Sequence, residues 1–239
     1  MDLIVNGIVE AWRLLVSGDR QTYQIAWLTL QVSGLATLMS IAIGVPLGTL
    51  LALGVFPGRR SAIGVFNAGM GLPPVVVGLI VSILLWRSGL LGALGLMYTP
   101  VAMVLAQVII ALPIVTALTV AAMQQIDPGL RLQILALGAS RPQYLALLIK
   151  EARLPLLAAA MAGFGSVVSE VGASMMVGGN IEGQTRVLTT ATVLEVSKGK
   201  FESAIALSAL LLLLVVVVSG ILTRAQQRAF RQPFVRIPG

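Results

Sequence analysis

Residues 135–155, LALGASRPQYLALLIKEARLP, lie within the one long polar insertion of this chain, which runs from 127 to 153. Leucines recur at helical spacing on both sides of Gly138, and the segment 139–142, ASRP, is typical of a turn. The pattern predicts a helix that breaks at Gly138 and resumes after Pro142. Taken alone, it fits either an ordinary helical loop between two membrane spans or a rigid elbow suited to docking against another protein.

Long uncharged runs lie on both sides of this insertion. The 239 residues are 57% hydrophobic and 10% charged, with a mean hydropathy of +0.97, well outside the range of soluble domains. A helix needs roughly 20 apolar residues to cross a bilayer. The runs therefore predict an all-α, multi-pass integral membrane protein with five spans, at about 26–53, 62–86, 101–123, 156–177 and 203–222.

The two ends of the chain differ from the transmembrane domain over 21–223. Segment 1–20 places Ile4, Ile8, Trp12 and Leu15 on one helical face, with polar side chains opposite, which predicts an amphipathic helix on the membrane surface. A frayed tail is the alternative. Segment 224–239 is predicted to be a basic tail.

The basic residues predict the orientation of the spans. Five spans divide the 16 basic residues into ten on one side and six on the other, and the richer side of a membrane protein is usually cytoplasmic. The amino terminus is then outside, and the insertion and the tail are in the cytoplasm. The ten are Arg59, Arg60, Arg131, Arg141, Lys150, Arg153, Arg224, Arg228, Arg231 and Arg236; the six are Arg13, Arg20, Arg87, Arg186, Lys198 and Lys200.

Several function classes are excluded by composition. The chain contains no Cys and no His, which removes thiol chemistry, imidazole ligands and Ser-His triads. Its net charge of +7 comes from basic residues scattered at the ends of apolar runs, so it does not indicate nucleic-acid binding. We therefore expect a protein that is not an enzyme, with no metal and no cofactor in this chain.

One carboxylate, Glu170, stands inside the apolar segment 166–180, SVVSEVGASMMVGGN. Such a residue usually faces protein or water and has a function. On a continuous helix, Ser166, Ser169 and Ser174 share the face of Glu170. Two interpretations stay open: this face lines a hydrated translocation path, or it permits close helix packing with Glu170 bonded to a neighbouring backbone or hydroxyl group in a structural or gating role.

Two further segments are candidate functional sites. Pro73 and Pro74 interrupt a predicted span, and the break is either a gate or a kink that shapes the bundle. The external loop after the fourth span offers hydrogen-bond donors and positive charge for an anion vestibule or for contact with a delivering protein, although loop polarity alone would explain most of this. Its candidate residues are Asn180, Thr185, Arg186, Thr189 and Thr190.

These motifs resemble those of the permease subunits of ABC importers. Gly138 and Leu154-Pro155 are similar to the Gly and Leu-Pro of that class's cytoplasmic loop, although Leu132, Gln133 and Ile134 stand where its Glu-Ala-Ala is common. Segments 71–81, GLPPVVVGLIV, and 163–201, GFGSVVSEVGASMMVGGNIEGQTRVLTTATVLEVSKGKF, are similar to tungstate permeases and, more loosely, to molybdate and sulfate permeases. The resemblance covers about 22–223.

The resemblance implies a type I ABC importer permease fold in a prokaryotic cytoplasmic (inner) membrane. It implies a homodimer of permeases with two ATPase subunits and an external binding protein, and a coupling helix that docks the ATPase through Leu137, Gly138, Ala139, Ser140 and Arg141. ATP and Mg would be held by the partner ATPase, because this chain has no Walker sequence. The expected function is import of an oxyanion, tungstate in the first place; molybdate or sulfate import, and a stand-alone secondary anion transporter, are the alternatives.

Overall fold

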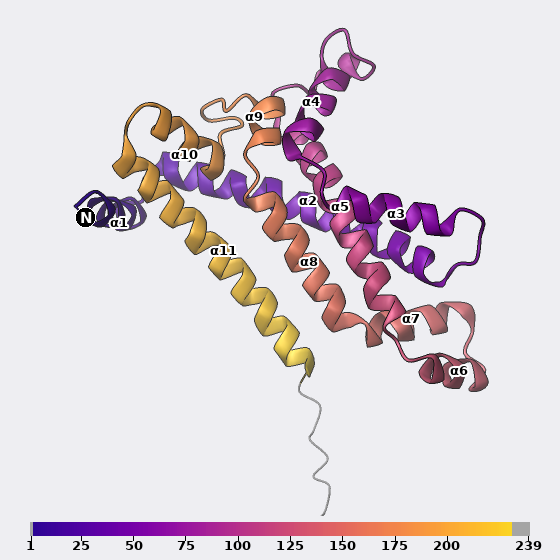
Figure 1. The fold of residues 1–239 in the computed structure, drawn as a ribbon. Helices are drawn as coiled ribbons and strands as arrows, with labels where there is room; N and C mark the ends of the chain where they lie inside the picture. The colour runs from indigo at the N-terminus through magenta and orange to yellow at the C-terminus, as the bar shows by residue number, and fades with distance from the viewer. Residues whose placement is uncertain (1, 231–239) are drawn as a thin grey trace, which may run out of the picture.

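The structure is a computed structural model that describes residues 2–230, and this part of the chain contains eleven α-helices, one short 3-10 helix and no strand (Figure 1). The all-α fold class is thereby confirmed. Residues 231–239, most of the predicted tail, lie outside the described residues. The helices are α1 Asp2–Val16, α2 Arg20–Leu53, α3 Arg59–Gly69, α4 Pro74–Leu85, η1 Gly92–Leu94, α5 Pro100–Gln124, α6 Pro128–Ala136, α7 Arg141–Glu151, α8 Arg153–Val168, α9 Gly172–Gly178, α10 Leu188–Ser197 and α11 Phe201–Phe230.

Three of the described helices are each long and apolar enough to cross a membrane: α2, α5 and α11. Two further spans are possible if each of two bent pairs counts as one, α3 with α4 and α8 with α9. The first pair is bent by 103° and the second by 60°. The predicted ranges 62–86 and 156–177 are therefore not straight helices.

The bend between α3 and α4 follows from the two consecutive prolines. A residue that precedes a proline is kept out of the helical region, and Pro73 accordingly has an extended backbone, with φ −64° and ψ 121°. Pro74 then takes the first position of α4, where its missing N–H costs no hydrogen bond. The prolines thus end one helix direction and begin another.

Helix α5 lies at the centre of the bundle and contacts α2, α3, α4, α8 and α9. Along α2, the face toward α5 carries small residues, which lets the two helices approach closely. A Cβ on Gly48 would lie 2.6 Å from the Thr119 Cβ and 2.7 Å from the Thr116 carbonyl oxygen. The hydroxyls of Thr29, Thr37 and Thr119 donate to carbonyls within their own helices and so need no partner across the interface.

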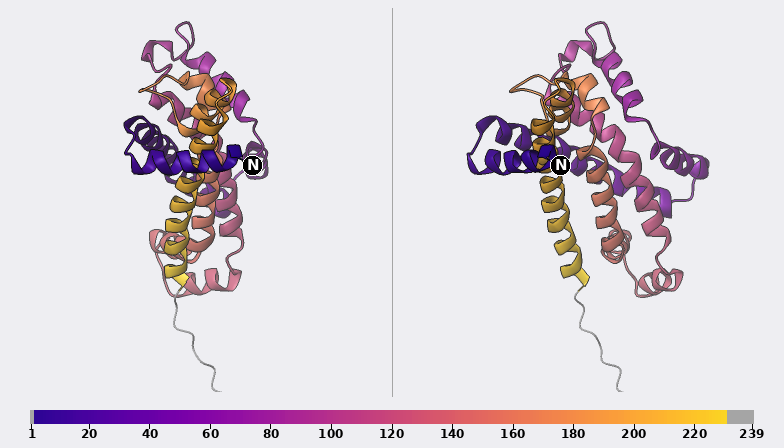
Figure 2. Two further views of the ribbon diagram at one scale, coloured as in Figure 1. Left: turned by 90° about the vertical axis from the view of Figure 1, so that its left-hand side faces the viewer. Right: turned by 60° about the vertical axis from the view of Figure 1, so that its left-hand side comes forward.

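A hydrophobic cluster joins the polar insertion to the ends of the spans. Ile134 of α6 and Leu148 of α7 are buried together with Leu51 of α2 and Met123 of α5. Figures 1 and 2 show α6 and α7 beyond the same end of α5 and α8. The insertion is therefore part of the packed structure.

Helix α1 lies across the start of α11 at the opposite end of the molecule (Figures 1 and 2). Gly7 permits this crossing, since a Cβ there would meet the Ile205 side chain at 2.4 Å. The Asn6 amide also donates to the Glu202 carboxylate at 3.1 Å. The apolar side chains of Ile4, Ile8 and Trp12 stay exposed, as a helix on a membrane surface requires.

Candidate functional site

The turn between α6 and α7, which we call the elbow (residues 137–141), protrudes from the packed insertion. Gly138 has φ +78°, a left-handed conformation that favours glycine, and nothing lies near the position of a Cβ. Leu137 beside it is 87% exposed, and Ser140 and Arg141 are also exposed, whereas Ala139 is half-buried. The structure thus brings the five predicted docking residues together at one tip.

Local hydrogen bonds hold the elbow in shape. The Gln143 amide oxygen accepts from the Ser140 backbone N–H at 2.8 Å and from its hydroxyl at 3.0 Å, which fixes the start of α7. At the start of α6, the Asp127 carboxylate accepts from the backbone N–H groups of Gly129 and Leu130. The Arg131 guanidinium donates to the Met123 carbonyl at the end of α5. The starts of both helices of the insertion are therefore capped, and α6 is also bonded to the end of α5.

The surface around the elbow is apolar. Exposed aliphatic side chains on both helices of the insertion are unusual in a polar segment, and such a patch indicates an interaction surface. They are Leu132, Leu135, Leu137, Leu145, Leu147 and Ile149.

Glu170 lies at the bend between α8 and α9 and is 8% exposed. Its carboxylate oxygen Oε1 accepts from the backbone N–H of Ala173 at 2.8 Å, one of the N–H groups that the start of α9 leaves without a helical partner. Its backbone carbonyl accepts from the Thr189 hydroxyl of α10 at 3.1 Å. Glu170 therefore stabilises the bend through both its side chain and its backbone.

The three serines near Glu170 lie in different surroundings because of that bend. Ser169 is exposed and donates to the Gly165 carbonyl at 2.8 Å, and Ser166 is half-buried. Ser174 is buried and accepts from the Gln107 amide of α5 at 3.3 Å. The single face expected of a continuous helix is divided in two.

Gln107 was missed by sequence reasoning. It is 2% exposed at the centre of α5, and its amide oxygen has no hydrogen-bond partner among the described residues. The signal was present, since Gln107 is an amide inside a long apolar run. It connects α5 to the Ser174 turn of α9.

The break between α3 and α4 lies against the break between α8 and α9. A Cβ on Gly78 of α4 would lie 2.7 Å from the Ala173 Cα of α9, so the two backbones touch there. Close to the breaks themselves, a Cβ on Gly172 would lie 2.7 Å from a methyl of Val75, the residue after Pro74. The structure thus brings Pro73, Pro74 and Glu170 into one region, where two short helices pack together (Figure 1).

The hydrogen bonds of the predicted vestibule residues lie mostly within the loop between α9 and α10. Thr185 is fully buried and donates to the Gly178 carbonyl at 2.6 Å, and the Thr190 hydroxyl donates to the Val187 carbonyl at 3.1 Å. The Thr189 hydroxyl donates to the backbone carbonyl of Glu170. Asn180, in a left-handed conformation, donates to the Thr190 carbonyl at 3.3 Å.

A polar groove lies beside this loop, between it and the start of α2. Arg186 donates to the Glu182 carboxylate at 3.0 Å, and Gln21 donates to the same carboxylate at 2.7 Å. Hydrogen bonds from the Thr22 hydroxyl and backbone N–H hold the pKa of the Asp19 carboxyl below its usual value. The groove also contains Arg20, Gln24, Gln31 and Gln184. Residues 2–230 contain no cluster of three acidic side chains that could hold a metal ion.

Two substitutions at Glu170 test its structural role. Glu170→Gln keeps an oxygen acceptor for the Ala173 N–H, so transport and thermal stability in detergent should stay close to those of the unchanged protein. Glu170→Leu leaves that buried N–H unpaired and should lower stability by about 1–3 kcal/mol. Equal and complete loss of transport in both variants would contradict this role and would show that the negative charge itself is required.

Comparison with known proteins finds a transport family, two permease proteins and a solved ABC transporter that resemble this chain. Residues 44–233 match the family described as binding-protein-dependent transport system inner membrane component. A probable anion ABC transporter permease protein of Haloferax volcanii is 40% identical over 84% of this chain and 88% of its own. The tungstate uptake system permease protein TupB of Peptoclostridium acidaminophilum is 37% identical over 95% of this chain and 100% of its own. Among solved structures, an inward-facing MetNI methionine ABC transporter matches 88% of this chain and 95% of its own with a TM-score of 0.70 and 23% identity.

Proposed function

The chain belongs to the family of binding-protein-dependent transport system inner membrane components, and on that basis we propose that it forms the membrane path of an ABC importer for an oxyanion, tungstate in the first place. The family membership confirms the resemblance seen in the sequence, and the fold is that of a type I importer permease. The observation that carries the substrate proposal is the likeness to the tungstate permease over nearly the whole of both chains. The protein is a transport subunit.

We propose the following assembly. Two copies of this chain form the path, two ATPase subunits dock on the elbows, and an external binding protein delivers the anion. ATP and Mg are held by the ATPases, because this sequence contains no phosphate-binding Gly-rich loop with Lys-Ser or Lys-Thr. The apolar surface around Leu137 is the ATPase contact in this proposal, since it is exposed at the tip of a polar insertion.

The packing of the insertion supports a route for coupling. Leu148 and Ile134 pack against the ends of α2 and α5, so a displacement of the elbow moves those helices with it. Only one residue separates the end of α7 from the start of α8, and α8 leads to the bend at Glu170. In the proposed mechanism, closure of the ATPases moves α8, and the α4–α9 pair beyond the bend changes its position and opens the path.

We assign path and gate roles by exposure. Ser169 and Ser166 lie on the accessible side of α8, between two copies of the chain in this proposal. To bind a passing oxyanion, the Ser169 hydroxyl would exchange its hydrogen bond to the Gly165 carbonyl for one to the anion. Ser174 and Glu170 act as positioning residues in this proposal, because both are buried. In addition, the Glu170 carboxylate would repel an anion. Pro73 and Pro74 supply the break on which α4 would move.

The external groove is better suited to the binding protein than to the free anion. It holds charges of both signs, Arg20 and Arg186 with Asp19 and Glu182, and a protein surface can complement both. Its position on the outer side rests on the proposed orientation, with the amino terminus outside and the carboxyl terminus in the cytoplasm.

Cellular uptake tests the substrate. With the gene present, cells in low tungstate should accumulate tungsten, measured by mass spectrometry, and a deletion strain should not. Accumulation should persist in excess molybdate and in excess sulfate. If either competitor removes it, the substrate must be reassigned to that anion, and transport without any co-expressed ATPase would contradict the importer mechanism.

A further inference from the structure

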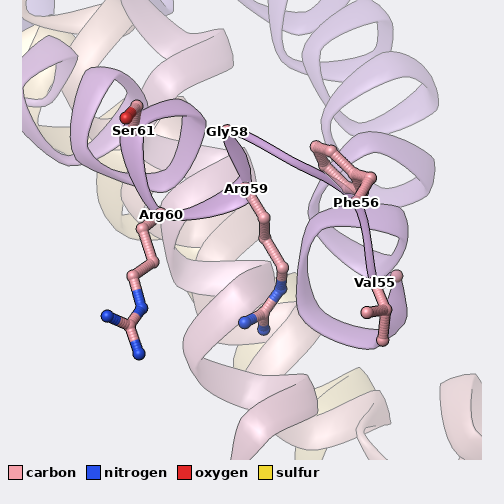
Figure 3. Close-up of a pocket in the computed structure, with 7 residues that line it drawn as sticks. Val55, Phe56, Gly58, Arg59, Arg60 and Ser61 are labelled. Carbon is pink, nitrogen blue, oxygen red and sulfur yellow. The ribbon is translucent and has the colours of Figure 1, made fainter.

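The turn between α2 and α3 forms a small basic pocket (Figure 3). The end of α2 beside it packs in the same hydrophobic cluster as α6 and α7, the helices on either side of the elbow. Its lining includes Gly54, Val55, Phe56, Arg59 and Arg60. The two guanidinium groups lie on the same side of the turn, as Figure 3 shows. The turn therefore combines two adjacent positive charges with apolar side chains at the end of a membrane span.

Arg59 is immobilised by hydrogen bonds. Its Nε donates to the Leu51 carbonyl at 2.6 Å and its terminal nitrogen donates to the Ala52 carbonyl at 2.9 Å, at the end of α2. A cation at a helix carboxyl end is favourable, so the guanidinium is held in one place. Arg59 therefore provides a fixed charge at one side of the pocket.

Arg60 has no internal counter-ion. It is exposed and makes no ion pair or hydrogen bond within residues 2–230. The sequence contains no acidic residue between Asp19 and Asp127. The charge of Arg60 is therefore open to an anion from outside the chain.

The apolar residues of the turn indicate which anion. Val55 is 101% exposed and Phe56 is 39% exposed, beside two arginines at the end of a span. At a bilayer surface, such side chains can enter the acyl region while the arginines stay at the level of the headgroups. A free phosphate would leave Val55 and Phe56 in water.

We propose that this pocket binds the phosphate group of an anionic phospholipid between Arg59 and Arg60, with Val55 and Phe56 against its acyl chains. Basic pockets at the membrane surface recognise anionic headgroups by this combination of charge and apolar contact. The site fixes the α2–α3 turn relative to the bilayer, next to the end of α2 that packs against the insertion. It is separate from the translocation path.

Native mass spectrometry of the purified full-length chain in detergent tests the site. The probes are phosphatidylglycerol and phosphatidylcholine with identical acyl chains, and inorganic phosphate alone. The unchanged protein should retain phosphatidylglycerol in preference to phosphatidylcholine. Arg60→Gln should lower that preference about fivefold, the effect expected of one basic residue at a membrane surface. Arg60→Glu should lower it further, and because Arg60 makes no hydrogen bond or ion pair within residues 2–230, neither variant should lose its fold.

Arg87→Gln is the matched control, since Arg87 is also an exposed arginine beside an exposed aromatic, Trp86, in the same acid-free stretch. Arg87 has no second arginine beside it, so Arg87→Gln should leave the preference for phosphatidylglycerol unchanged. The proposal is overturned if Arg87→Gln and Arg60→Gln have equal effects, or if inorganic phosphate alone occupies the site as well as the lipid does. A loss of ATPase capture in Arg60→Gln with lipid binding unchanged would assign the pocket to the ATPase instead.

Discussion

Gly138→Asp is expected to abolish substrate uptake and ATPase capture while the protein still reaches the membrane at its normal level. The substitution puts a carboxylate at the exposed tip of the elbow, beside Leu137, where the proposed contact is apolar. Gly138 also has φ +78°, which a residue with a side chain adopts only with strain of about 1–2 kcal/mol. Burying the new charge against the ATPase costs more than that strain, so the loss of docking should be the dominant effect.

Gly199→Asp is its matched control. Gly199 has φ +73°, is exposed and has nothing near the position of its Cβ, so the backbone strain is the same. It lies between α10 and α11, away from the insertion. Co-purification of the ATPase and uptake should both survive in this variant. Normal ATPase capture and transport in Gly138→Asp would refute the docking role of the elbow.

Gly48→Ala is expected to cause the largest loss of stability among the Gly→Ala substitutions in α2. The new Cβ would lie 2.7 Å from the Thr116 carbonyl oxygen, and backbone cannot move aside as a side-chain end can. Overpacking of a close helix contact costs on the order of 3 kcal/mol. Helix α2 would have to separate from α5, the helix at the centre of the bundle.

Gly34→Ala, in the same helix, gives the comparison. Nothing lies within 4 Å of its Cβ position, and alanine favours a helix over glycine by about 1 kcal/mol. Thermal unfolding in detergent should therefore show a large fall in Tm for Gly48→Ala and an unchanged or higher Tm for Gly34→Ala. Equal Tm values for the two variants would mean that the α2–α5 contact is looser than the structure has it.

The fold class and the elbow could be predicted because local sequence controls both. Long apolar runs require helices in a bilayer, and a glycine between two leucine-rich segments predicts the break that Gly138 makes. The position of the α3–α4 break also followed from Pro73 and Pro74, although the sequence did not indicate an angle as large as 103°.

The surroundings of Glu170 could not be predicted in the same way. The bend beside it depends on contacts with segments far along the chain, the Thr189 hydroxyl of α10 and the backbone of α4 at Gly78. A helical face drawn from 166 to 174 assumes a straight helix and therefore groups Ser169 with Ser174, which the bend separates. The same applies to Thr185, whose hydroxyl bonds to a carbonyl seven residues earlier and not to solvent.

The joint between α7 and α8 limits how this protein can change in length during evolution. Only Ala152 separates the two helices, and it is buried in the cluster that holds the insertion. One inserted residue there would rotate α8 by about 100° relative to α7 and turn its packed face away from α5. In the long segment between α4 and α5, the residues before Leu96 have no such joint, whereas Leu96 and Met97 pack against the core. Length differences between relatives should therefore accumulate before Leu96 and be absent from the α7–α8 joint.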